Sequence, residues 1–166
     1  MSDLVSPSRR TLVIIPTYNE RENLPVLVRQ VMAHAGFRVM VVDDQSPDGT
    51  GQIADELARE FPGRVEVMHR TGKRGLGRSY IDALKVAAQG DADAVCQMDA
   101  DLSHDPSYLP ALTAAAETAD VVIGSRYLHG VSVVNWPLHR IFLSTFANRY
   151  IRAVTRLSAS DCTSGF

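Results

Sequence analysis

Residues 11–31, TLVIIPTYNERENLPVLVRQV, pass from a short apolar run into an amphipathic helix pattern, and this pairing indicates the fold class. The run Thr11–Ile15 is rich in β-branched side chains and almost continuous, which is typical of a strand covered on both faces. Asn23 is a favourable helix cap, and Pro25 suits the first turn that follows it. One face of the predicted helix then carries Leu24, Leu27, Val28 and Val31.

The same alternation continues along the chain. Four further apolar runs are predicted as strands: Val39–Val42, Val65–Met68, Ala94–Met98 and Val121–Ile123. Between them, a second helix follows Asp48 and a fourth begins at the cap Asp105-Pro106. The third helix is marked by Tyr80, Leu84 and Ala87. Strands that alternate with helices predict βαβ units, and hence an α/β fold with a mainly parallel sheet flanked by helices.

The composition restricts the possible classes of protein. The chain has 166 residues, of which 45% are apolar and 22% charged, as in ordinary globular domains. Its formal net charge of −2 argues against a binder of nucleic acid. Its two cysteines are too few for a disulfide framework or a zinc site, and no apolar stretch is long enough to cross a membrane. We expect a flexible segment at 1–10 followed by one cytoplasmic domain at 11–166.

Polar residues gather where four of the predicted strands end. Pro16–Glu20 follow the first strand and Asp43–Ser46 the second, while Asp99–Asp101 follow the fourth and Gly124–Tyr127 the fifth. The carboxyl ends of parallel strands share one edge of a sheet, and open α/β folds bind their ligands there. The sequence therefore predicts a binding site at this edge.

The segment Asp99-Ala100-Asp101 is the most informative of these. Two carboxylates placed two residues apart after an apolar strand can face the same ion, and hard oxygen ligands suit Mg²⁺ or Mn²⁺. Without a cation, repulsion between the two charges would raise the pKa of one carboxyl. A solvated turn that begins at Asp101 is the alternative. We interpret the segment as a metal site that would in turn hold a diphosphate.

Three further side chains at strand ends can contact a nucleotide. Asp44 lies near the position from which an acidic residue reads a ribose hydroxyl in nucleotide-binding folds. Asp48 is expected to cap the following turn, which would leave Asp44 available for a ligand. Tyr18 can stack on a base or pack at the strand edge. Arg126 can neutralise a phosphate bidentately or pair with a neighbouring acid.

Other features leave two interpretations each. Gly72–Gly77 suits either a basic loop over an anionic ligand or a glycine-rich helix entry. His104 follows Asp101 closely and could join the acidic cluster. Residues 138–157 predict a basic amphipathic helix that either covers the sheet or lies on an anionic membrane surface. Its apolar stripe consists of Leu143, Ala147, Tyr150, Val154 and Leu157.

Five stretches carry a family likeness when they are taken together: Val13–Leu24, Val42–Asp44, Ser46–Thr50, Met98–Ser103 and Gly124–Tyr127. In combination they resemble the family 2 glycosyltransferases of GT-A fold, and within that family the dolichol-phosphate or polyprenol-phosphate mannose synthases. The resemblance covers nearly the whole chain from residue 11 and implies a Rossmann-like nucleotide-sugar-binding domain. Family domains continue past Phe166, so we expect the family's C-terminal part to be missing. The match is extended by Trp136, Arg140, Ser144, Ala147-Asn148 and Asp161-x-Thr163-x-Gly165.

The resemblance implies a nucleotide site at the ends of the first two strands. Pro16, Tyr18 and Glu20 would hold the base and ribose edge of a nucleotide sugar, which is GDP-mannose in the mannose synthases. Val42 and Asp44 would lie beside them.

The resemblance also implies a diphosphate and metal site. Asp99, Ala100 and Asp101 would lie at the diphosphate and at a Mg²⁺ or Mn²⁺ ion, with the two aspartates as catalytic residues. Ser103 stands where some members have a third metal ligand, often Gln, so a contact from Ser would be weaker or made through water. Arg126, also implied as catalytic, would meet the phosphates or the acceptor.

The implied reaction moves mannose from GDP-mannose to a polyprenyl monophosphate with inversion at the anomeric carbon. The partners are then the sugar nucleotide, the lipid phosphate and a membrane surface at its cytoplasmic face, with no nucleic acid. Three alternatives remain open. The donor is UDP-glucose or another sugar nucleotide, the acceptor is a growing glycan, or the chain is a non-catalytic half domain that binds a nucleotide sugar.

Overall fold

The computed structural model describes residues 10–72, 75–127, 138–157 and 159–166, without the side chains of Leu138 and Arg140. The chain divides into two compact units, Met1–Asp120 and Val121–Phe166, which we call the sheet unit and the C-terminal unit. The segment predicted to be flexible, 1–10, lies outside the described residues except for Arg10. Trp136 and two residues of the glycine-rich loop, 73–74, also lie outside them.

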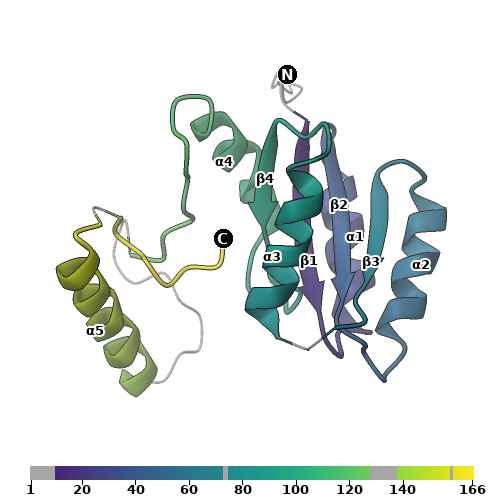
Figure 1. Ribbon diagram of the computed structural model, residues 1–166. Helices are drawn as coiled ribbons and strands as arrows, with labels where there is room; N and C mark the ends of the chain where they lie inside the picture. Colours follow the sequence, from purple (N-terminus) through teal and green to yellow (C-terminus); the bar gives the residue numbers. More distant parts are fainter. Residues whose placement is uncertain (1–9, 73–74, 128–137, 158) are drawn as a thin grey trace. The chain divides into compact units, whose positions relative to one another are not determined.

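The sheet unit contains four strands in the order β3-β2-β1-β4 (Figure 1). All three pairs of neighbouring strands are parallel, and the register aligns Thr17 at the end of β1 with Asp43 at the end of β2. The predicted parallel sheet flanked by helices is therefore confirmed. The strands are β1 Thr11–Thr17, β2 Phe37–Asp43, β3 Val65–His69 and β4 Ala94–Gln97.

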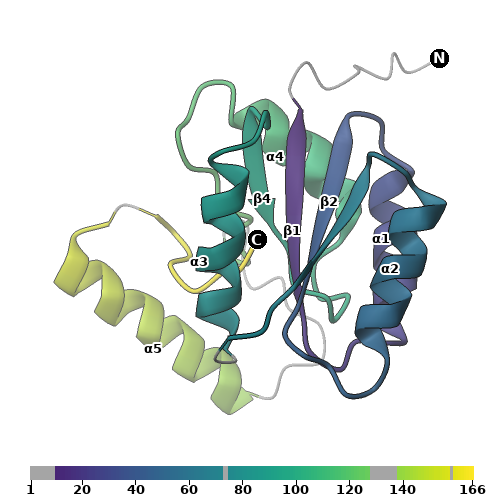
Figure 2. The same cartoon turned by 45° about the vertical axis from the view of Figure 1, so that its right-hand side comes forward.

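Helices connect the strands and cover both faces of the sheet (Figure 2). On one face α3 packs against β1, β2 and β4, while α1 packs against β2 and α2 on the other. A 3₁₀ turn at Pro106–Tyr108 leads into α4. The helices of this unit are α1 Asn23–Met32, α2 Thr50–Glu60, α3 Leu76–Ala87 and α4 Leu109–Ala115.

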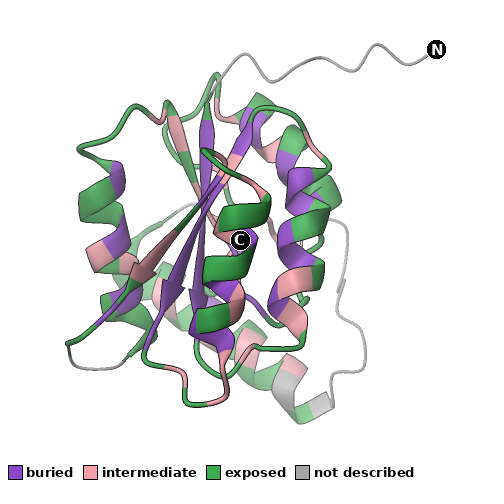
Figure 3. Cartoon of the chain, turned by 90° about the vertical axis from the view of Figure 1, so that its right-hand side faces the viewer, coloured by how far each residue is buried: buried purple, intermediate pink, exposed green. Residues whose placement is uncertain are grey.

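The core is apolar on both faces of the sheet, and the central strands β1 and β2 are buried along nearly their whole length, whereas β3 and β4 are mostly half-buried or exposed (Figure 3). The predicted face of α1 is confirmed, since Leu24, Leu27, Val28 and Val31 are all buried. In α3 the buried positions are the small residues Ser79, Ala83 and Ala87. The predicted face of this helix is wrong at Leu84, which is 37% exposed, because small side chains occupy the side facing the sheet.

Of the three predicted caps, only the one at Asn23 is wrong. Asn23 is the first residue of α1 rather than its cap, and its amide donates to the Glu20 carboxylate at 2.9 Å. α2 begins at Thr50, whose backbone N–H donates to Asp48 at 3.0 Å, so Asp48 does fix the turn. Asp105 caps as predicted, accepting the backbone N–H of Ser107 at 2.9 Å.

The predicted fifth strand, Val121–Ile123, is wrong. These described residues have no strand conformation, and Val121 is 76% exposed. The neighbouring Gly124 N–H donates to the Phe166 carbonyl at 2.7 Å, inside the C-terminal unit. A run of three apolar residues is too short to fix a strand without a partner strand that buries it. Gly124, which follows the run, bonds to Phe166 and not to a strand of the sheet.

The C-terminal unit contains one long helix, α5, at Leu138–Thr155, which confirms the predicted helix to within two residues. The face it buries inside its own unit is not the predicted apolar stripe. Asn148 is buried, with Ser144 and Ile151 half-buried on the same side. The large apolar side chains that remain exposed on this helix are Phe142, Leu143, Phe146, Tyr150 and Val154, and we call them the apolar face of α5; Leu157, just past the helix, is also exposed.

Candidate functional site

The candidate site is the edge of the sheet at which β1 and β4 end. The chain passes from β1 to β2 on one side, and later crosses back over the sheet through α3 to place β4 on the other side of β1. A change of direction of this kind marks the place where open α/β folds bind their ligands. Tyr18–Glu20 follow β1, which ends with Pro16 and Thr17, and Asp99–Asp101 lie just after β4.

The loops that follow β1 and β2 are joined by hydrogen bonds. The backbone N–H of Asn19 donates to the Ser46 hydroxyl at 3.1 Å, and that of Glu20 donates to the Thr50 hydroxyl at 2.9 Å. The Thr50 hydroxyl in turn donates to Asp48 at 2.6 Å. These bonds fix the backbone of both loops, so a ligand would meet an edge that is already formed.

Three residues at this edge have left-handed backbone conformations. Asn19 (φ 61°), Gln45 (φ 59°) and Leu102 (φ 62°) follow β1, β2 and β4 respectively. Asn is tolerated in this region, whereas Leu is disfavoured there by about 1 kcal/mol or more because its Cβ crowds the backbone. A disfavoured conformation such as that of Leu102, next to Asp101, is typical of a functional edge.

Asp44 has protein partners, contrary to the expectation that it is left free. Its side chain is 8% exposed and forms a buried ion pair with Nη1 of Arg70. Its second carboxylate oxygen accepts the backbone N–H of Gly75 at 2.7 Å. Arg70 also donates to the Ser79 hydroxyl at 3.2 Å and to Asp82 at 3.0 Å. This network joins the ends of β2 and β3 to the first two turns of α3.

Asp99 is contacted from two directions. Its carboxylate Oδ1 accepts the Tyr80 hydroxyl at 3.1 Å, while its backbone N–H donates to Nδ1 of His104 at 3.0 Å. The other ring nitrogen, Nε2, lies 3.9 Å from Oδ2 of Asp99. Burial, the charge of Asp99 and the hydrogen bond from the Tyr80 hydroxyl to Asp99 all raise the pKa of Tyr80. The Tyr80 hydroxyl therefore keeps its proton and stays a donor. His104 therefore contacts Asp99, the first residue of the acidic segment that the sequence allowed it to join.

Asp101 opens the turn that the sequence allows as an alternative to a metal site. Its Oδ1 accepts the backbone N–H of Ser103 at 3.0 Å. Burial raises the pKa of Asp101, but the hydrogen bonds from Ser103 and the proximity of His104 outweigh it, so the pKa lies below its ordinary value. The carboxyl is therefore ionised at neutral pH, and the backbone bond engages only one of its oxygens.

The remaining predicted contact residues differ in accessibility. Pro16, Val42 and Ala100 are buried, so their side chains shape the edge from beneath. Tyr18 is 47% exposed, and Glu20 is half-buried beside the loop after β2. Only Tyr18 and Glu20 of these five present side-chain surface.

Arg126 lies in the C-terminal unit and pairs with a residue far along the chain. Its guanidinium donates to both carboxylate oxygens of Asp161, at 2.7 and 2.8 Å, and to the Thr163 hydroxyl at 2.6 Å. The Asp161 side chain is fully buried and also accepts from the Asn148 amide of α5 at 3.2 Å. Of the two predicted interpretations, an ion pair is therefore present, though with Asp161 rather than with an acid at a strand end.

A family comparison adds to this geometry. The model of the family Glycosyl transferase family 2 matches residues 12–166, which is almost the whole chain. The chain belongs to glycosyltransferase family 2.

Two curated relatives in this family are similar over most of the chain. Polyprenol monophosphomannose synthase of Mycolicibacterium smegmatis is 49% identical over 98% of this chain and 62% of its own length. Undecaprenyl-phosphate mannosyltransferase of Micrococcus luteus is 46% identical over 95% of this chain and 65% of its own length. The chain thus spans less than two thirds of the length of these relatives.

A solved structure of similar fold is that of a mannosyltransferase from Pyrobaculum calidifontis in complex with GDP-Man and Mn²⁺. It superposes with a TM-score of 0.59 at 25% identity, over 71% of this chain and 35% of that protein. This family chain therefore has the GT-A sheet expected from the resemblance.

The donor chemistry at the end of β4 fits a divalent cation. Asp99 and Asp101 supply carboxylate oxygens, the ligand type that Mg²⁺ and Mn²⁺ prefer. Within the described ranges there is no group of three or more His, Cys, Asp and Glu side chains suited to a metal. Two carboxylates suffice where phosphate oxygens and water complete the coordination, as is usual for Mg²⁺.

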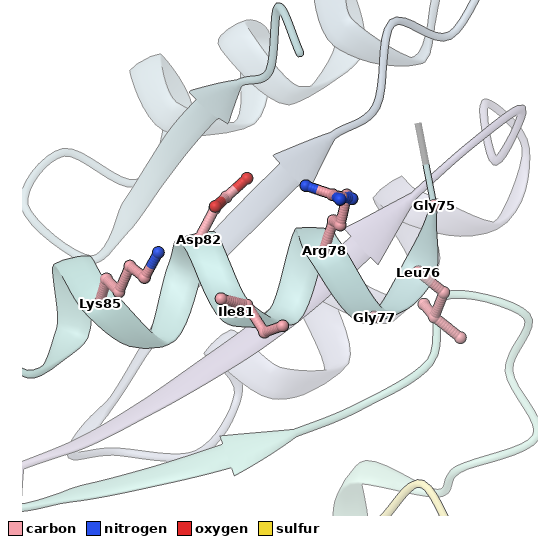
Figure 4. A pocket seen from close by; sticks show the side chains of 7 residues that line it. All are labelled: Gly75, Leu76, Gly77, Arg78, Ile81, Asp82 and Lys85. Carbon is pink, nitrogen blue, oxygen red and sulfur yellow. The ribbon is translucent and has the colours of Figure 1, made fainter. Parts of the chain in front are cut away.

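A pocket of about 570 Å³ lies along the start of α3 (Figure 4). Gly75 and Asp82 in its lining are the residues that bond to Asp44 and Arg70. In Figure 4 the side chains of Arg78, Asp82 and Lys85 lie on one side of the helix. The pocket thus borders the polar network, and among the described residues it is lined only by α3 and by Gly75, which precedes this helix.

Two residues that contact the predicted site residues Asp44 and Asp99 do not follow from the sequence analysis. Arg70 directly follows β3, so the same strand-end argument applied to the third strand would have found it. Tyr80 was assigned to the apolar face of its helix, and nothing in the local sequence signals that its hydroxyl reaches Asp99.

Proposed function

We propose that this chain provides the donor-binding part of a transferase that moves mannose from GDP-mannose to a polyprenyl monophosphate. The observation that carries the proposal is the position of Asp99 and Asp101, two carboxylates at the end of β4 beside the change of direction in the sheet. Support comes from the names of the two relatives, which are a polyprenol monophosphomannose synthase and an undecaprenyl-phosphate mannosyltransferase. The GDP-Man and Mn²⁺ in the Pyrobaculum structure support the donor and the metal.

The main electrostatic demand of this reaction is the departing diphosphate. Asp99 and Asp101 would hold a Mg²⁺ or Mn²⁺ ion, with Ser103 near enough in sequence to bind one of its waters. A bound divalent cation would neutralise negative charge on the leaving group. The carboxylates themselves cannot do so, since they repel the phosphates unless a cation lies between them.

The nucleotide would lie along the ends of β1 and β2. Tyr18 offers its exposed ring to the base, and Glu20 and Asp44 offer carboxylate oxygens to amino and hydroxyl donors. Each oxygen of Asp44 already accepts one hydrogen bond and has a second lone pair. The pair with Arg70 keeps this carboxylate charged and fixed in place.

The acceptor explains why no strong general base is needed. The oxygen of a phosphate monoester is already ionised at neutral pH and can attack the anomeric carbon directly. Attack opposite the leaving diphosphate inverts the configuration there. Arg126 would help to neutralise the phosphates, held in its orientation by Asp161.

A lipid acceptor would be met at a membrane surface, and α5 has a suitable composition for contact with one. Its apolar face is exposed, and Arg149 and Arg152 are exposed on the same helix. Each Arg near an anionic surface adds about 1 kcal/mol of attraction. No helix in the described part of the chain is long and apolar enough to span a bilayer.

Vesicle flotation tests the membrane contact. Binding to anionic vesicles at low salt, reduced at high salt or with neutral lipids, is expected. Binding that ignores lipid charge and salt, or no binding, would leave α5 without a membrane role.

The metal site is tested by Asp101→Ala, with Asp120→Ala as a matched control because Asp120 is exposed. Calorimetric titration with GDP-mannose and Mn²⁺ should show metal-dependent binding to the control, and none to Asp101→Ala. Metal-dependent affinity that is unchanged in a folded Asp101→Ala protein would remove the assignment.

The nucleotide site is tested by Asp44→Ala, which should weaken GDP binding by about 1–3 kcal/mol through the loss of a charge-assisted hydrogen bond. Asp44→Asn keeps the shape of the side chain and separates the charge from packing against Arg70. If the unaltered chain binds GDP and its 2′,3′-dideoxyribose analogue equally, Asp44 is not the ribose contact.

Transfer itself is tested with labelled GDP-mannose and a short polyprenyl phosphate. Formation of a lipid-linked mannose would support an enzyme. Donor binding without transfer would instead favour a binding half domain.

A further inference from the structure

We propose that Tyr80 and His104 are positioning residues that orient Asp99 toward the divalent cation. The inference rests on the proposed function, because it assumes that Asp99 is a metal ligand. Neither residue follows from the D-x-D spacing. They come from different directions, Tyr80 from α3 and His104 from the turn after Asp101, and both contact Asp99.

Tyr80 acts on the carboxylate itself. It is half-buried on α3, and its hydroxyl donates to Oδ1 of Asp99 at 3.1 Å. A carboxylate at the end of a strand otherwise rotates freely about its last bond, and only some rotations direct its lone pairs at a shared ion. The hydrogen bond selects one rotation before the metal arrives, as outer partners of metal-ligating carboxylates do.

His104 acts on the backbone. Because Nδ1 accepts the Asp99 N–H, it carries no proton in this arrangement, and a neutral ring holds its proton on Nε2. That nitrogen lies 3.9 Å from Oδ2 of Asp99, which is beyond hydrogen-bond distance. Its interaction with this oxygen is therefore electrostatic and not a hydrogen bond. The ring is largely buried, with 14% of its side chain exposed, which keeps it in place.

Together the two contacts fix both ends of Asp99, the carboxylate and the peptide. Neither hydrogen bond uses Oδ2, which lies 3.9 Å from Nε2 of His104. The arrangement leaves that oxygen for the cation, with Asp101 two residues further on. Loss of either contact should therefore weaken metal binding without removing a ligand.

The test is titration of the purified chain with Mn²⁺, followed by the electron paramagnetic resonance signal of the free ion. Tyr80→Phe and His104→Ala should each weaken Mn²⁺ binding about tenfold, the usual effect of removing an outer partner of a metal ligand. His104→Asn places an amide oxygen close to Nδ1 and should recover most of the loss. Tyr108→Phe, the same change at an exposed tyrosine, should bind Mn²⁺ like the unaltered chain.

Thermal unfolding of each variant separates orientation from loss of fold. If one variant does not fold, the other carries the test, because each residue contacts Asp99 by itself. Unchanged Mn²⁺ affinity in folded Tyr80→Phe and His104→Ala would overturn the inference while leaving the metal site in place. No Mn²⁺ binding by the unaltered chain would overturn the metal site and the inference together.

Discussion

The two units of the chain are stabilised in opposite ways. The sheet unit buries a continuous apolar core, in which Val13, Ile14 and Leu27 have no exposed surface. The C-terminal unit is organised around a buried carboxylate, Asp161, which holds Arg126 and Asn148. The large apolar side chains of its helix point outward instead.

This difference indicates that the sheet unit is a rigid scaffold, whereas the C-terminal unit mainly orients polar side chains. Apolar burial provides most of the stability of a fold, whereas a buried ion pair offsets its own desolvation and mainly fixes geometry. The sheet unit can therefore hold strained loops at its edge. The C-terminal unit holds one arginine in a defined orientation against Asp161 and leaves the apolar face of α5 exposed.

The largest effect is expected from Leu27→Ala in the sheet unit. Leu27 is fully buried in α1, so the cavity should lower the free energy of unfolding by about 4 kcal/mol. Val26→Ala on the same helix is the matched control, since Val26 is 47% exposed. Urea denaturation gives both values. Equal effects of the two substitutions would contradict the assigned face of α1.

A somewhat smaller effect is expected from Asp161→Ala in the C-terminal unit. The change removes the carboxylate that pairs with the partly exposed Arg126 guanidinium. It should lower the free energy of unfolding by about 3 kcal/mol. Hydrogen exchange followed by mass spectrometry should show faster exchange in α5 and unchanged protection in β1 and β2. Asp120→Ala should change neither. Unaltered exchange in α5 would show that Asp161 does not organise this unit.

Protonation of Asp161 should have the same consequence as its substitution. Burial raises the pKa of Asp161, but the hydrogen bonds from Arg126 and Thr163 and the Arg126 charge outweigh it and hold the pKa well below its ordinary value. A lowered pKa stabilises the fold fully above the unfolded value of about 3.9, and the stabilisation is lost as pH falls toward the folded value. Protection of α5 should thus be constant from pH 7 to 5 and decline only in stronger acid. Loss between pH 7 and 5 would point to another group.

The smallest effect on stability is expected from Phe146→Ser on the apolar face of α5. Phe146 is 62% exposed, so the free energy of unfolding should change by no more than about 0.5 kcal/mol. The same variant should bind anionic vesicles more weakly than the unaltered chain. A large loss of stability would show that this face is part of a core.

Local pattern predicted the four strands of the sheet because each is an apolar, β-branched run bounded by turn residues. It failed at Val121–Ile123, where three residues carried too little information without a partner strand. The polar edge was predictable because parallel strands bring their carboxyl ends together. The pairs Asp44–Arg70 and Arg126–Asp161 were not, since they join residues 26 and 35 positions apart and depend on tertiary structure.

Binding of the donor to the unaltered chain tests the central claim, that the edge at the ends of β1, β2 and β4 is a metal-dependent nucleotide-sugar site. Isothermal titration would compare GDP-mannose with UDP-glucose, each in Mn²⁺ and in EDTA. If this edge is such a site, the chain binds GDP-mannose in Mn²⁺, loses that binding in EDTA, and binds UDP-glucose more weakly. A folded chain that binds neither donor in Mn²⁺, or binds GDP-mannose equally well in EDTA, would contradict it.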